Sequence, residues 1–560
     1  MRELLCFLMI GFIAPFQLPS YVAAGDIDYS KPFPLSRLEY PISDAPYDPW
    51  TILDVDNIQI NSDNTTQVQN EEMVCINPTN TANAVAIWRD FRLGFRRVGI
   101  GYTFDGGQTW HDTLLYVPPY PKQSDPVLTV DSNGNFFACT LVLNLDLSRS
   151  AIYVQKSTDG GVSWSDPVIA IDSVEGVFED KQWMTLDRTS GPTNGNIYIS
   201  WTRFTDITEI LLVSSSDGGE TYSDPVYVSD EFGVQWSVPT VGAWGDVFVA
   251  WFQYYPTRGI FLDVSSDQGR TFGQDMLLVR TAVWPDEIGG GILVFPYPAL
   301  NSDVSLLSPY MGNLYMAFMD ENVTDMDIFF MKSEDNGATW SEPLRINDDP
   351  LHNGADQFHP WITVDESGVV HAVFYDRRLD AEHNWLFDVY YTRSEDAGEN
   401  WLPNERITTV SSNPSDARLA GLIGEYIGLD AWQGEVQMVW TDTRNGNQDV
   451  FSGRMSATGI ESDIAAVPDR LRLRTPHPNP FNASVTVAFQ SDLETPVTLE
   501  IVDILGRRTA TLFDGICRTG VNRFVWDGTD MTGGEVASGT YFVRMSGPDG
   551  VQVKKAVLLR

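Results

Sequence analysis

Thr103-Phe-Asp-Gly-Gly-Gln-Thr-Trp110 is a short segment that recurs five more times along the chain. The other copies are Ser157–Trp164, Ser215–Tyr222, Ser265–Phe272, Ser333–Trp340 and Ser394–Trp401. Each copy places an Asp two residues after a Ser or Thr, a Gly two residues later, and an aromatic residue at its end. Successive Asp residues lie 54, 58, 50, 68 and 61 residues apart, near the length of one four-stranded sheet. A repeat of this length predicts a chain of similar β-sheets.

The repeat is typical of a turn between two strands. Asp, Ser and Thr side chains hydrogen-bond backbone groups of their own turn, and Gly accepts a positive φ. The closing aromatic ring is suited to burial between neighbouring sheets. The residues with this structural role are Asp105, Asp159, Asp217, Asp267, Asp335 and Asp396.

The six segments resemble Asp boxes, the bacterial neuraminidase repeats of the sialidase superfamily. The resemblance covers residues 50–456 and implies an all-β fold, an Asp-box β-propeller. It implies no activity by itself, because the box stabilises a hairpin and many functions share one fold.

Strand patterns also indicate the number of blades. A strand pair precedes each box, and a seventh set of strands, Gly424–Leu429, Glu435–Trp440 and Asp449–Arg454, has no box after it. Its missing outer strand is available from Trp50–Asp56 near the other end of the domain. We therefore predict seven blades with a shared closing blade; six, the usual sialidase count, is the alternative.

Composition excludes several classes of protein. The 560 residues include 76 Asp and Glu against 36 Lys and Arg, a net charge of −40. Nucleic acids and anionic membranes favour a basic surface, so neither is expected as a main partner. The charge itself is most simply a solvated surface.

The N-terminus is typical of an exported protein. Arg2 precedes the apolar run Leu4–Ile13, and Val22-Ala-Ala24 is a small-residue cleavage pattern. We interpret residues 1–24 as a signal peptide and 25–49 as an N-terminal extension. The mature chain has no other segment long enough to span a membrane. Its three cysteines predict buried thiols or at most one disulfide.

The C-terminal part of the chain differs from the preceding residues in net charge and in the pattern of its predicted strands. After a linker at 457–469, residues 470–560 carry 11 basic and 9 acidic residues, whereas residues 25–469 have a net charge of −42. Short alternating strands predict a small β-sandwich. The motifs His477-Pro-Asn-Pro-Phe-Asn482 and Ala537-Ser-Gly-Thr-Tyr541 and the end Lys554–Arg560 resemble the immunoglobulin-like sorting domain of type IX secretion, a relative of the flagellar hook-capping fold. The resemblance implies outer-membrane secretion machinery as a partner; a plain spacer is the alternative.

Propeller topology predicts where a site would lie. Residues at the start of each innermost strand and the end of the next strand share the mouth of the central channel. Candidate catalytic residues at these positions are Asp125, Asp180, Asp376, Glu425 and Tyr426. Candidate substrate-binding residues are Arg92, Arg203, Arg378, Arg444, His359, Trp183 and Trp361. Carboxylates, arginines and flat rings are the groups that a glycosidase acting on an anionic sugar needs.

Each group also has a structural interpretation. The Asp–Arg pairs after the second strands are equally suited to bridging neighbouring blades, since repeated positions usually serve the repeat. His359 before Pro360 suits a turn. Neighbouring residues of a strand face opposite sides, which argues against Glu425 and Tyr426 both pointing into the channel. No cofactor is required; Ca²⁺ is an option in so acidic a protein, although no ordered calcium-loop motif occurs.

The resemblance implies an exported, sialidase-like propeller that acts on or binds carbohydrate or glycoprotein at the cell surface. In that family three arginines bind the substrate carboxylate, an Asp is the acid/base, and a Tyr assisted by a Glu is the nucleophile. The family's Arg-Ile-Pro motif is absent here; the nearest text is Arg37-Leu-Glu-Tyr-Pro41. Exo-glycosidase activity and noncatalytic binding of glycan or protein therefore remain alternatives, with an acidic coat protein as a third.

Overall fold

The computed structural model describes most of the chain. The described residues are 55–283, 286–322, 325–417, 419–456, 471–474, 476, 479, 481–491, 493–503, 507–531, 533–548 and 550–559. The predicted signal peptide, N-terminal extension and linker lie outside these residues.

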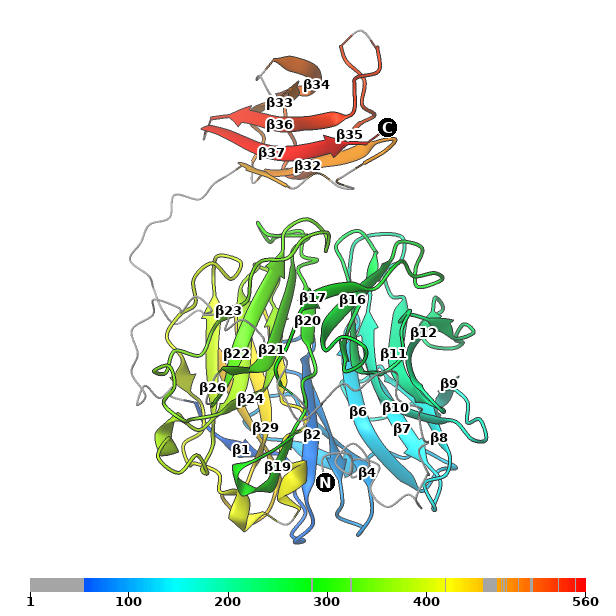
Figure 1. Cartoon of the computed structure of the whole chain (residues 1–560), viewed down its shortest axis with the longest axis vertical. Coiled ribbons are helices and arrows are strands. Elements are labelled where there is room, and N and C mark those ends of the chain that lie inside the picture. The colour runs from blue at the N-terminus through cyan, green and yellow to red at the C-terminus, as the bar shows by residue number, and fades with distance from the viewer. Residues whose placement is uncertain are drawn as a thin grey trace.

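Seven four-stranded antiparallel sheets follow one another along the first part of the chain (Figure 1). Blades 1 to 3 are β2 (Gln69–Ile76), β3 (Ala84–Asp90), β4 (Arg97–Thr103) and β5 (His111–Leu114); β6 (Lys122–Val130), β7 (Phe136–Leu143), β8 (Ser150–Ser157) and β9 (Val168–Ile171); and β10 (Phe178–Leu186), β11 (Ile197–Phe204), β12 (Thr208–Ser215) and β13 (Val226–Tyr227).

Blades 4 to 7 continue the same order. They are β14 (Val234–Val241), β15 (Val247–Gln253), β16 (Gly259–Ser265) and β17 (Met276–Val279); β20 (Ala299–Ser302), β21 (Leu314–Asn322), β22 (Asp325–Ser333) and β23 (Leu344–Arg345); β24 (Gln357–Val364), β25 (Val370–Asp376), β26 (Asp388–Ser394) and β27 (Glu405–Arg406); and β28 (Gly428–Trp432), β29 (Glu435–Asp442), β30 (Asp449–Ser456) and β1 (Ile58–Gln59). A small hairpin of β18 (Asp286–Ile288) and β19 (Ile292–Val294) lies in the connections, together with the 3-10 turns Gly289–Gly291, Arg378–Asp380, Pro414–Asp416 and Ala420–Leu422.

The first strands of the sheets form a closed ring. Each contacts the first strand of the next sheet, in the order β2, β6, β10, β14, β20, β24 and β28, and β28 contacts β2 again. The fold is therefore a β-propeller, and the all-β prediction is confirmed. The ring is closed by β1, in which Ile58 pairs with Ser452 and Gln59 with Phe451. The sequence placed this strand at Trp50–Asp56; it forms immediately after that stretch, and residues 50–54 lie outside the described residues.

The repeated turns share one hydrogen-bond pattern. In all six copies the backbone N–H four residues after the Asp donates to the Asp Oδ1, at 2.8 to 3.0 Å. The opening Ser or Thr hydroxyl accepts from the backbone N–H of the Gly, at 2.8 to 3.1 Å. Those glycines have φ between 76° and 94°, which a residue with a Cβ adopts only under strain. The turn is thus held by its own side chains.

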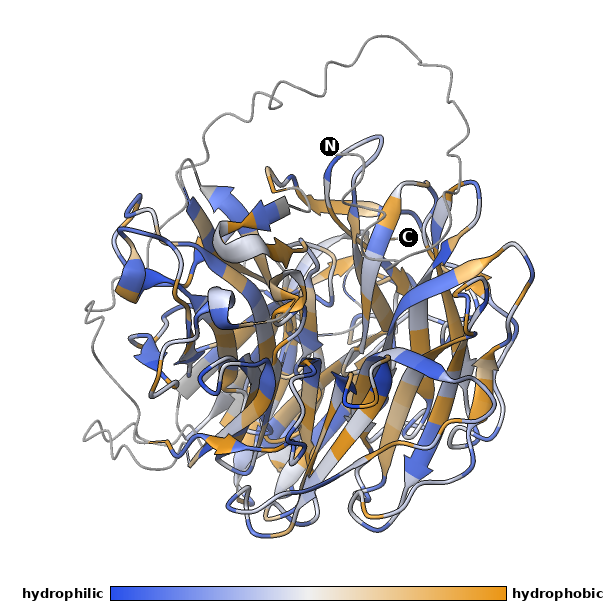
Figure 2. Ribbon diagram, turned by 90° about the horizontal axis from the view of Figure 1, so that it is seen from below, coloured by the Kyte–Doolittle hydropathy of each residue, from blue (hydrophilic) through white to orange (hydrophobic). Residues whose placement is uncertain are grey.

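Packing between the strands explains some of the composition. Trp88 is fully buried, and an added Cβ at Gly99 on the neighbouring strand would lie 2.3 Å from its indole ring. Gly at that position therefore makes room for the large ring. Figure 2 shows hydrophobic residues along the strands and many hydrophilic residues in the connecting loops.

The C-terminal part forms a second β-structure with its own hydrophobic core. A three-stranded sheet contains β31 (Leu471–Leu473), β32 (Val485–Ser491) and β35 (Gly520–Trp526). A four-stranded sheet contains β34 (Arg508–Ile516), β33 (Pro496–Asp503), β36 (Gly539–Gly547) and β37 (Gly550–Leu558). Alternate residues of β32 are buried, as expected of a sheet with one face on a core, and both sheets contribute to that core. The predicted small sandwich is confirmed.

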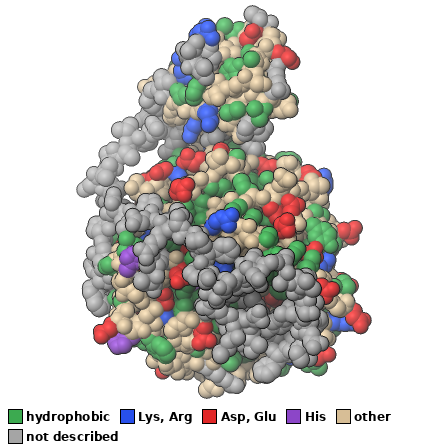
Figure 3. Space-filling view, viewed as in Figure 1, with side chains coloured by type: hydrophobic (Ala, Val, Ile, Leu, Met, Phe, Trp, Pro, Cys, Tyr) green, Lys and Arg blue, Asp and Glu red, His purple; other side chains and the backbone are tan. Residues whose placement is uncertain are grey.

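Two further sequence predictions concern membranes and thiols. Within the described part of the chain, no helix has the length and apolar character needed to cross a membrane. Cys75, Cys139 and Cys517 are all free thiols, Cys75 half-buried and the other two buried. The face seen in Figure 3 carries scattered acidic side chains over the propeller, consistent with its charge.

Candidate functional site

Five innermost strands carry a β-bulge near their first residues. The pairing register shifts around Glu71, Asp125, Lys181, Trp236 and His359, and each of these residues has a left-handed φ between 48° and 61°. Such a conformation costs a residue with a Cβ about 1 to 2 kcal/mol. Bulges next to sites re-aim side chains, and four of these five residues, Glu71, Asp125, Lys181 and Trp236, line one cavity.

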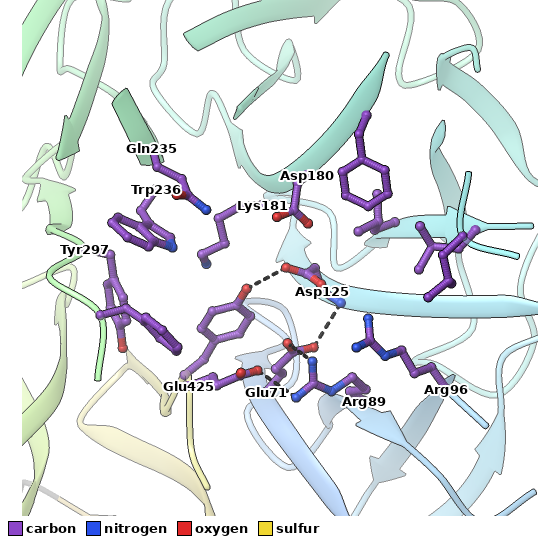
Figure 4. Close-up of a pocket in the computed structure, with 16 residues that line it drawn as sticks. Glu71, Arg89, Arg96, Asp125, Asp180, Lys181, Gln235, Trp236, Tyr297 and Glu425 are labelled. Atoms are coloured by element: carbon purple, nitrogen blue, oxygen red, sulfur yellow. Dashed lines mark hydrogen bonds and ion pairs between the residues drawn. The ribbon is translucent and has the colours of Figure 1, made fainter. Parts of the chain in front are cut away.

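A cavity lies where these positions meet at the channel mouth (Figure 4). Its polar and charged lining residues are Glu71, Arg89, Arg96, Asp125, Asp180, Lys181, Gln235 and Glu425. Its aromatic lining residues are Phe178, Trp236, Phe295, Tyr297 and Tyr426. The space inside measures about 40 Å³, which admits water molecules.

Arg89 binds two carboxylates from opposite ends of the propeller chain. Its Nη1 lies 2.6 Å from Glu71 Oε1 in blade 1, and its Nη2 lies 2.7 Å from Glu425 Oε2, just before blade 7. Its Nε donates to Asn70 Oδ1 at 2.8 Å. With Arg89 only 3% exposed, this is a buried charge cluster that joins the first and last blades.

Asp125 and Tyr426 form the central pair of the cavity. The Tyr426 hydroxyl donates to Asp125 Oδ2 at 3.0 Å. The backbone N–H of Asp125 donates to Glu71 Oε2 at 2.9 Å, and the Gln182 side chain donates to the Asp125 carbonyl. Burial raises the pKa of Tyr426 well above its usual value. The phenol therefore keeps its proton unless a base accepts it, and Asp125 is placed to do so.

Asp180 is the second carboxyl group of the cavity, and burial favours its neutral form. Burial, followed by the negative charge of Asp125, raises the pKa of Asp180 to about 8. Asp180 is accordingly a neutral carboxylic acid at pH 7 and can donate a proton. A carboxyl group that keeps its proton at neutral pH can act as the general acid of acid–base catalysis.

Lys181 places an ammonium group against aromatic rings. Its Nζ lies 3.5 Å from the centroid of the Tyr426 ring and 4.4 Å from that of Trp183. Within the described chain this buried nitrogen has no hydrogen-bond partner. Burial lowers the pKa of Lys181 to about 8. Cation–π contacts stabilise the charged form where no carboxylate binds it directly.

Arg96 is the second cation without a direct partner. It lines the cavity, and among the described residues none hydrogen-bonds or ion-pairs with its guanidinium. Burial, followed by the charge of Arg89, lowers its pKa. Arg96 and Lys181 are thus the cations of the cavity that are available to an anionic group.

Four of the five predicted catalytic residues meet in this cavity: Asp125, Asp180, Glu425 and Tyr426. Glu425 and Tyr426 both line it, although neighbouring strand residues normally face opposite sides. Glu425 has φ 59°, so the backbone is not extended there and the alternation fails.

His359, Trp183 and Trp361 lie beside the cavity without lining it. The Trp183 ring is 4.7 Å from the Trp361 ring and 5.3 Å, edge to face, from the Tyr426 ring. His359 is fully buried and stacks on Tyr297 at 6.0 Å. Burial, with the charge of Lys181, lowers the pKa of His359 to about 3, so the imidazole is neutral. These three residues support the aromatic wall of the site.

The structure does not bring the other predicted residues to the cavity. Arg92, Arg203, Arg378 and Arg444 bind carboxylates at 2.6 to 2.8 Å, namely Asp90, Glu179, Asp376 and Asp442. Asp376, the remaining catalytic candidate, is one of these partners. For Arg92, Arg378 and Arg444 the reason is local, because an Arg two residues after an Asp folds back onto it. Arg203 instead binds Glu179, its pairing partner on the neighbouring strand. Indole N–H groups of Trp88 and Trp440 donate to the same Asp90 and Asp442 carboxylates. These residues stabilise the ends of the second strands.

Sequence reasoning missed several lining residues, above all Glu71 and Arg96. One signal was available: Glu71 and Glu72 are consecutive carboxylates in a strand that continues as the largely apolar Met73–Ile76. Two adjacent acids entering an apolar strand indicate a bulge or a buried partner for one of them.

A metal role receives no support from side-chain grouping. Within the described residues, no three or more His, Cys, Asp or Glu side chains are placed to hold a metal ion.

Comparisons with known proteins found likeness in structure only. No family model matches the sequence, and no curated protein matches it. A protein of unknown function from Dyadobacter fermentans DSM 18053 is similar at 14% identity and TM-score 0.40, over 71% of this chain and 97% of its own.

Several of the similar structures are named as enzymes, and two serve as examples. The Hadza microbial sialidase Hz136 matches at 13% identity and TM-score 0.39, over 66% of this chain and 73% of its own. The alpha-L-arabinofuranosidase Arb93A from Fusarium graminearum matches at 9% identity and TM-score 0.41, over 72% of this chain and 98% of its own. At these identities and scores the likeness carries no argument about activity, which depends on the site itself.

Proposed function

We propose that the protein is an exported glycoside hydrolase that acts on carbohydrate at the mouth of the propeller channel. The observation that carries the proposal is the Tyr426–Asp125 hydrogen bond of 3.0 Å beside Asp180, whose pKa of about 8 keeps it protonated. A nucleophile with its base, next to a separate acid, is the set of groups that glycoside hydrolysis uses.

The proposed chemistry assigns one role to each group. Asp180 donates its proton to the glycosidic oxygen as the bond to the leaving group breaks. The Tyr426 oxygen attacks the anomeric carbon while Asp125 accepts the phenol proton. Water then displaces the tyrosine, with Asp180 taking a proton from it and Asp125 returning its proton to Tyr426. Glu71 and Arg89 position Asp125 through its backbone N–H and hold the cluster rigid.

The finer proposal is exo-α-sialidase-like hydrolysis of an acidic sugar. Its anion-binding groups are Arg96 and Lys181, which replace the four arginines expected from sequence. A desolvated ammonium and guanidinium without carboxylate partners favour an anionic group on the substrate. The missing Arg-Ile-Pro motif means that this cation set differs from that of the sialidase family.

A second function is favoured by the small size of the cavity. Its 40 Å³ is far below the roughly 300 to 1,000 Å³ typical of ligand pockets, so a sugar enters only if side chains move. A rigid propeller with this mouth would instead bind glycan or protein without turning it over. The mouth then serves as a polar binding face.

The expected location follows from both ends of the chain. A signal peptide at residues 1–24 would direct export, and an immunoglobulin-like sorting domain at 470–560 would engage type IX machinery of the outer membrane. The Asp-box turns would stabilise the propeller outside the cell. Ca²⁺ remains an option that chelation can test.

A panel of fluorogenic exo-glycosides, sialosides included, tests the function on the purified full-length protein with Ca²⁺ or with EDTA. We expect turnover of at least one acidic glycoside, lost in Asp125→Asn and Asp180→Asn. Asp206→Asn, at an exposed position outside the cavity, is the matched control and should keep full activity. No turnover of any glycoside by a cooperatively melting protein would favour the binding propeller, and a glycan array would follow.

A further inference from the structure

A second cavity, of about 500 Å³, lies on the outer edge of blade 1. Its lining residues are Tyr102 on β4, Trp110 between β4 and β5, His111, Asp112 and Thr113 on β5, and Ser62 and Val162 from other parts of the chain. Because β5 is the outermost strand of its sheet, this cavity lies away from the central channel. Its volume is within the range of small-ligand pockets.

Aromatic rings form one wall of this cavity. The Tyr102 and His111 rings are 5.4 Å apart and tilted by 31°. Trp110 also lines the cavity, and Phe104, which lies outside the lining, packs edge-on against Tyr102 at 6.0 Å and is 51% exposed. Val162, from the turn of blade 2, is 49% exposed beside them. Exposed rings with an apolar body are the surfaces on which the C–H faces of sugars stack.

The polar groups of the cavity carry almost no available charge. Asp112 is the acidic lining residue, and its side chain is only 2% exposed. Arg92 binds its Oδ2 at 2.7 Å, and the backbone N–H of Ser62 donates to its Oδ1 at 3.2 Å. The uncharged polar groups of the lining residues are the hydroxyls of Ser62, Tyr102 and Thr113, the His111 ring and the indole N–H of Trp110, which has no hydrogen-bond partner among the described residues.

We propose that this cavity binds a neutral saccharide chain, separately from the channel mouth. The aromatic wall supplies stacking, and the hydroxyls and imidazole supply hydrogen bonds to sugar hydroxyls. A polyanionic glycan would be opposed by the net charge of −40 and would find no unpaired cation here. The site would hold a polymer against the protein without contributing to turnover.

Affinity electrophoresis of the full chain in gels containing neutral polysaccharides tests the proposal. The probes are a linear arabinan, a galactan, a mannan and a β-glucan, with polygalacturonate as the anionic comparison. We expect retardation by at least one neutral polymer and none by polygalacturonate. In His111→Ala the dissociation constant should rise about tenfold, which is the order of one stacked ring, and Phe104→Ala, which removes the ring packed against Tyr102, should also raise it.

The control variant is Tyr227→Ala, which removes an exposed ring from the outer strand of blade 3. It should bind the polymer as the unaltered protein does, and melting temperatures should show that all variants are folded. Two results would overturn the proposal: no neutral polymer retards the protein, or Phe104→Ala and His111→Ala bind as tightly as Tyr227→Ala. The first would favour an extended peptide added to the open edge of β5.

Discussion

The Tyr426 hydroxyl donates to Asp125 Oδ2 at 3.0 Å, although the two residues are 301 positions apart in sequence. Tyr426 precedes the inner strand of blade 7, and Asp125 sits in the bulge of the inner strand of blade 2. Closure of the ring brings them together with Glu71 and Arg89 of blade 1. The candidate site therefore depends on the same joint that completes the propeller.

Activity should depend on pH through Asp180. Its folded pKa of about 8 lies above the ordinary value of 3.8, so the proton is retained through neutrality and lost as pH rises through about 8. We expect kcat/KM to fall along that alkaline limb, because the general acid disappears. A pH–rate profile measures this, and a rate that rises through pH 8 would contradict the assignment.

The same pKa makes a prediction for stability. Between about pH 4 and pH 8 the folded state holds a proton that the unfolded state releases, so Asp180 lowers the free energy of unfolding as pH rises. Asp180→Asn removes this pH-dependent loss of stability, because an amide does not titrate. Its gain in melting temperature should therefore be larger at pH 8 than at pH 5; an equal gain at both would show that Asp180 titrates normally.

Arg89→Met tests the charge cluster that joins blades 1 and 7. Removing the cation leaves Glu71 and Glu425 buried without it, a loss of about 3 to 5 kcal/mol in free energy of unfolding. Arg149→Met is the matched control, because the Arg149–Glu175 pair is exposed and such pairs contribute about 0 to 1 kcal/mol. Denaturant unfolding compares the two. Equal losses would mean that Arg89 does not hold the ring closed.

Asp105→Ala and Asp159→Ala test the repeated turns. Each removes a side chain that accepts the backbone N–H four residues later, at 2.9 Å, and should cost about 0.5 to 2 kcal/mol, as loss of a helix cap does. Melting temperatures should fall while ligand binding is kept. Asp166→Ala, an exposed Asp just beyond one turn, should change neither. An unchanged melt with lost binding would give these residues a binding role instead.

Deletion of residues 470–560 tests the sorting proposal. The propeller and the C-terminal sandwich have separate hydrophobic cores, so the truncated chain should still melt cooperatively. It should not reach the cell surface of a host with type IX machinery. Surface labelling of full-length and truncated chains measures delivery. Normal delivery of the truncated chain would show that residues 470–560 are not a sorting domain.

The fold was largely predictable because its signals are local. Each repeated turn closes on its own Asp and Gly, and the seventh set of strands was located at Gly424–Leu429 and beyond, close to the observed β28 to β30. The closing strand was predicted at Trp50–Asp56, of which residues 50–54 lie outside the described residues; the observed pairing with β30 is made by Ile58 and Gln59.

The site was predictable only in part. Topology placed Asp125, Asp180 and Tyr426 at the mouth because they open inner strands. It could not show that the Arg378 side chain folds back onto Asp376, because the direction of that side chain depends on its rotamer and on the residues that bury it. Nor could it show the left-handed backbone at Glu425, which turns two adjacent side chains into one cavity.

The most direct test of the account is turnover by Tyr426→Phe on the best glycoside of the panel. This change removes one oxygen, the one that donates to Asp125, and leaves the ring that packs on Lys181 and Trp183. We expect kcat/KM to fall about 100-fold or more with an unchanged melting temperature, while Tyr227→Phe stays fully active. Unchanged turnover by Tyr426→Phe would contradict the proposed catalytic site.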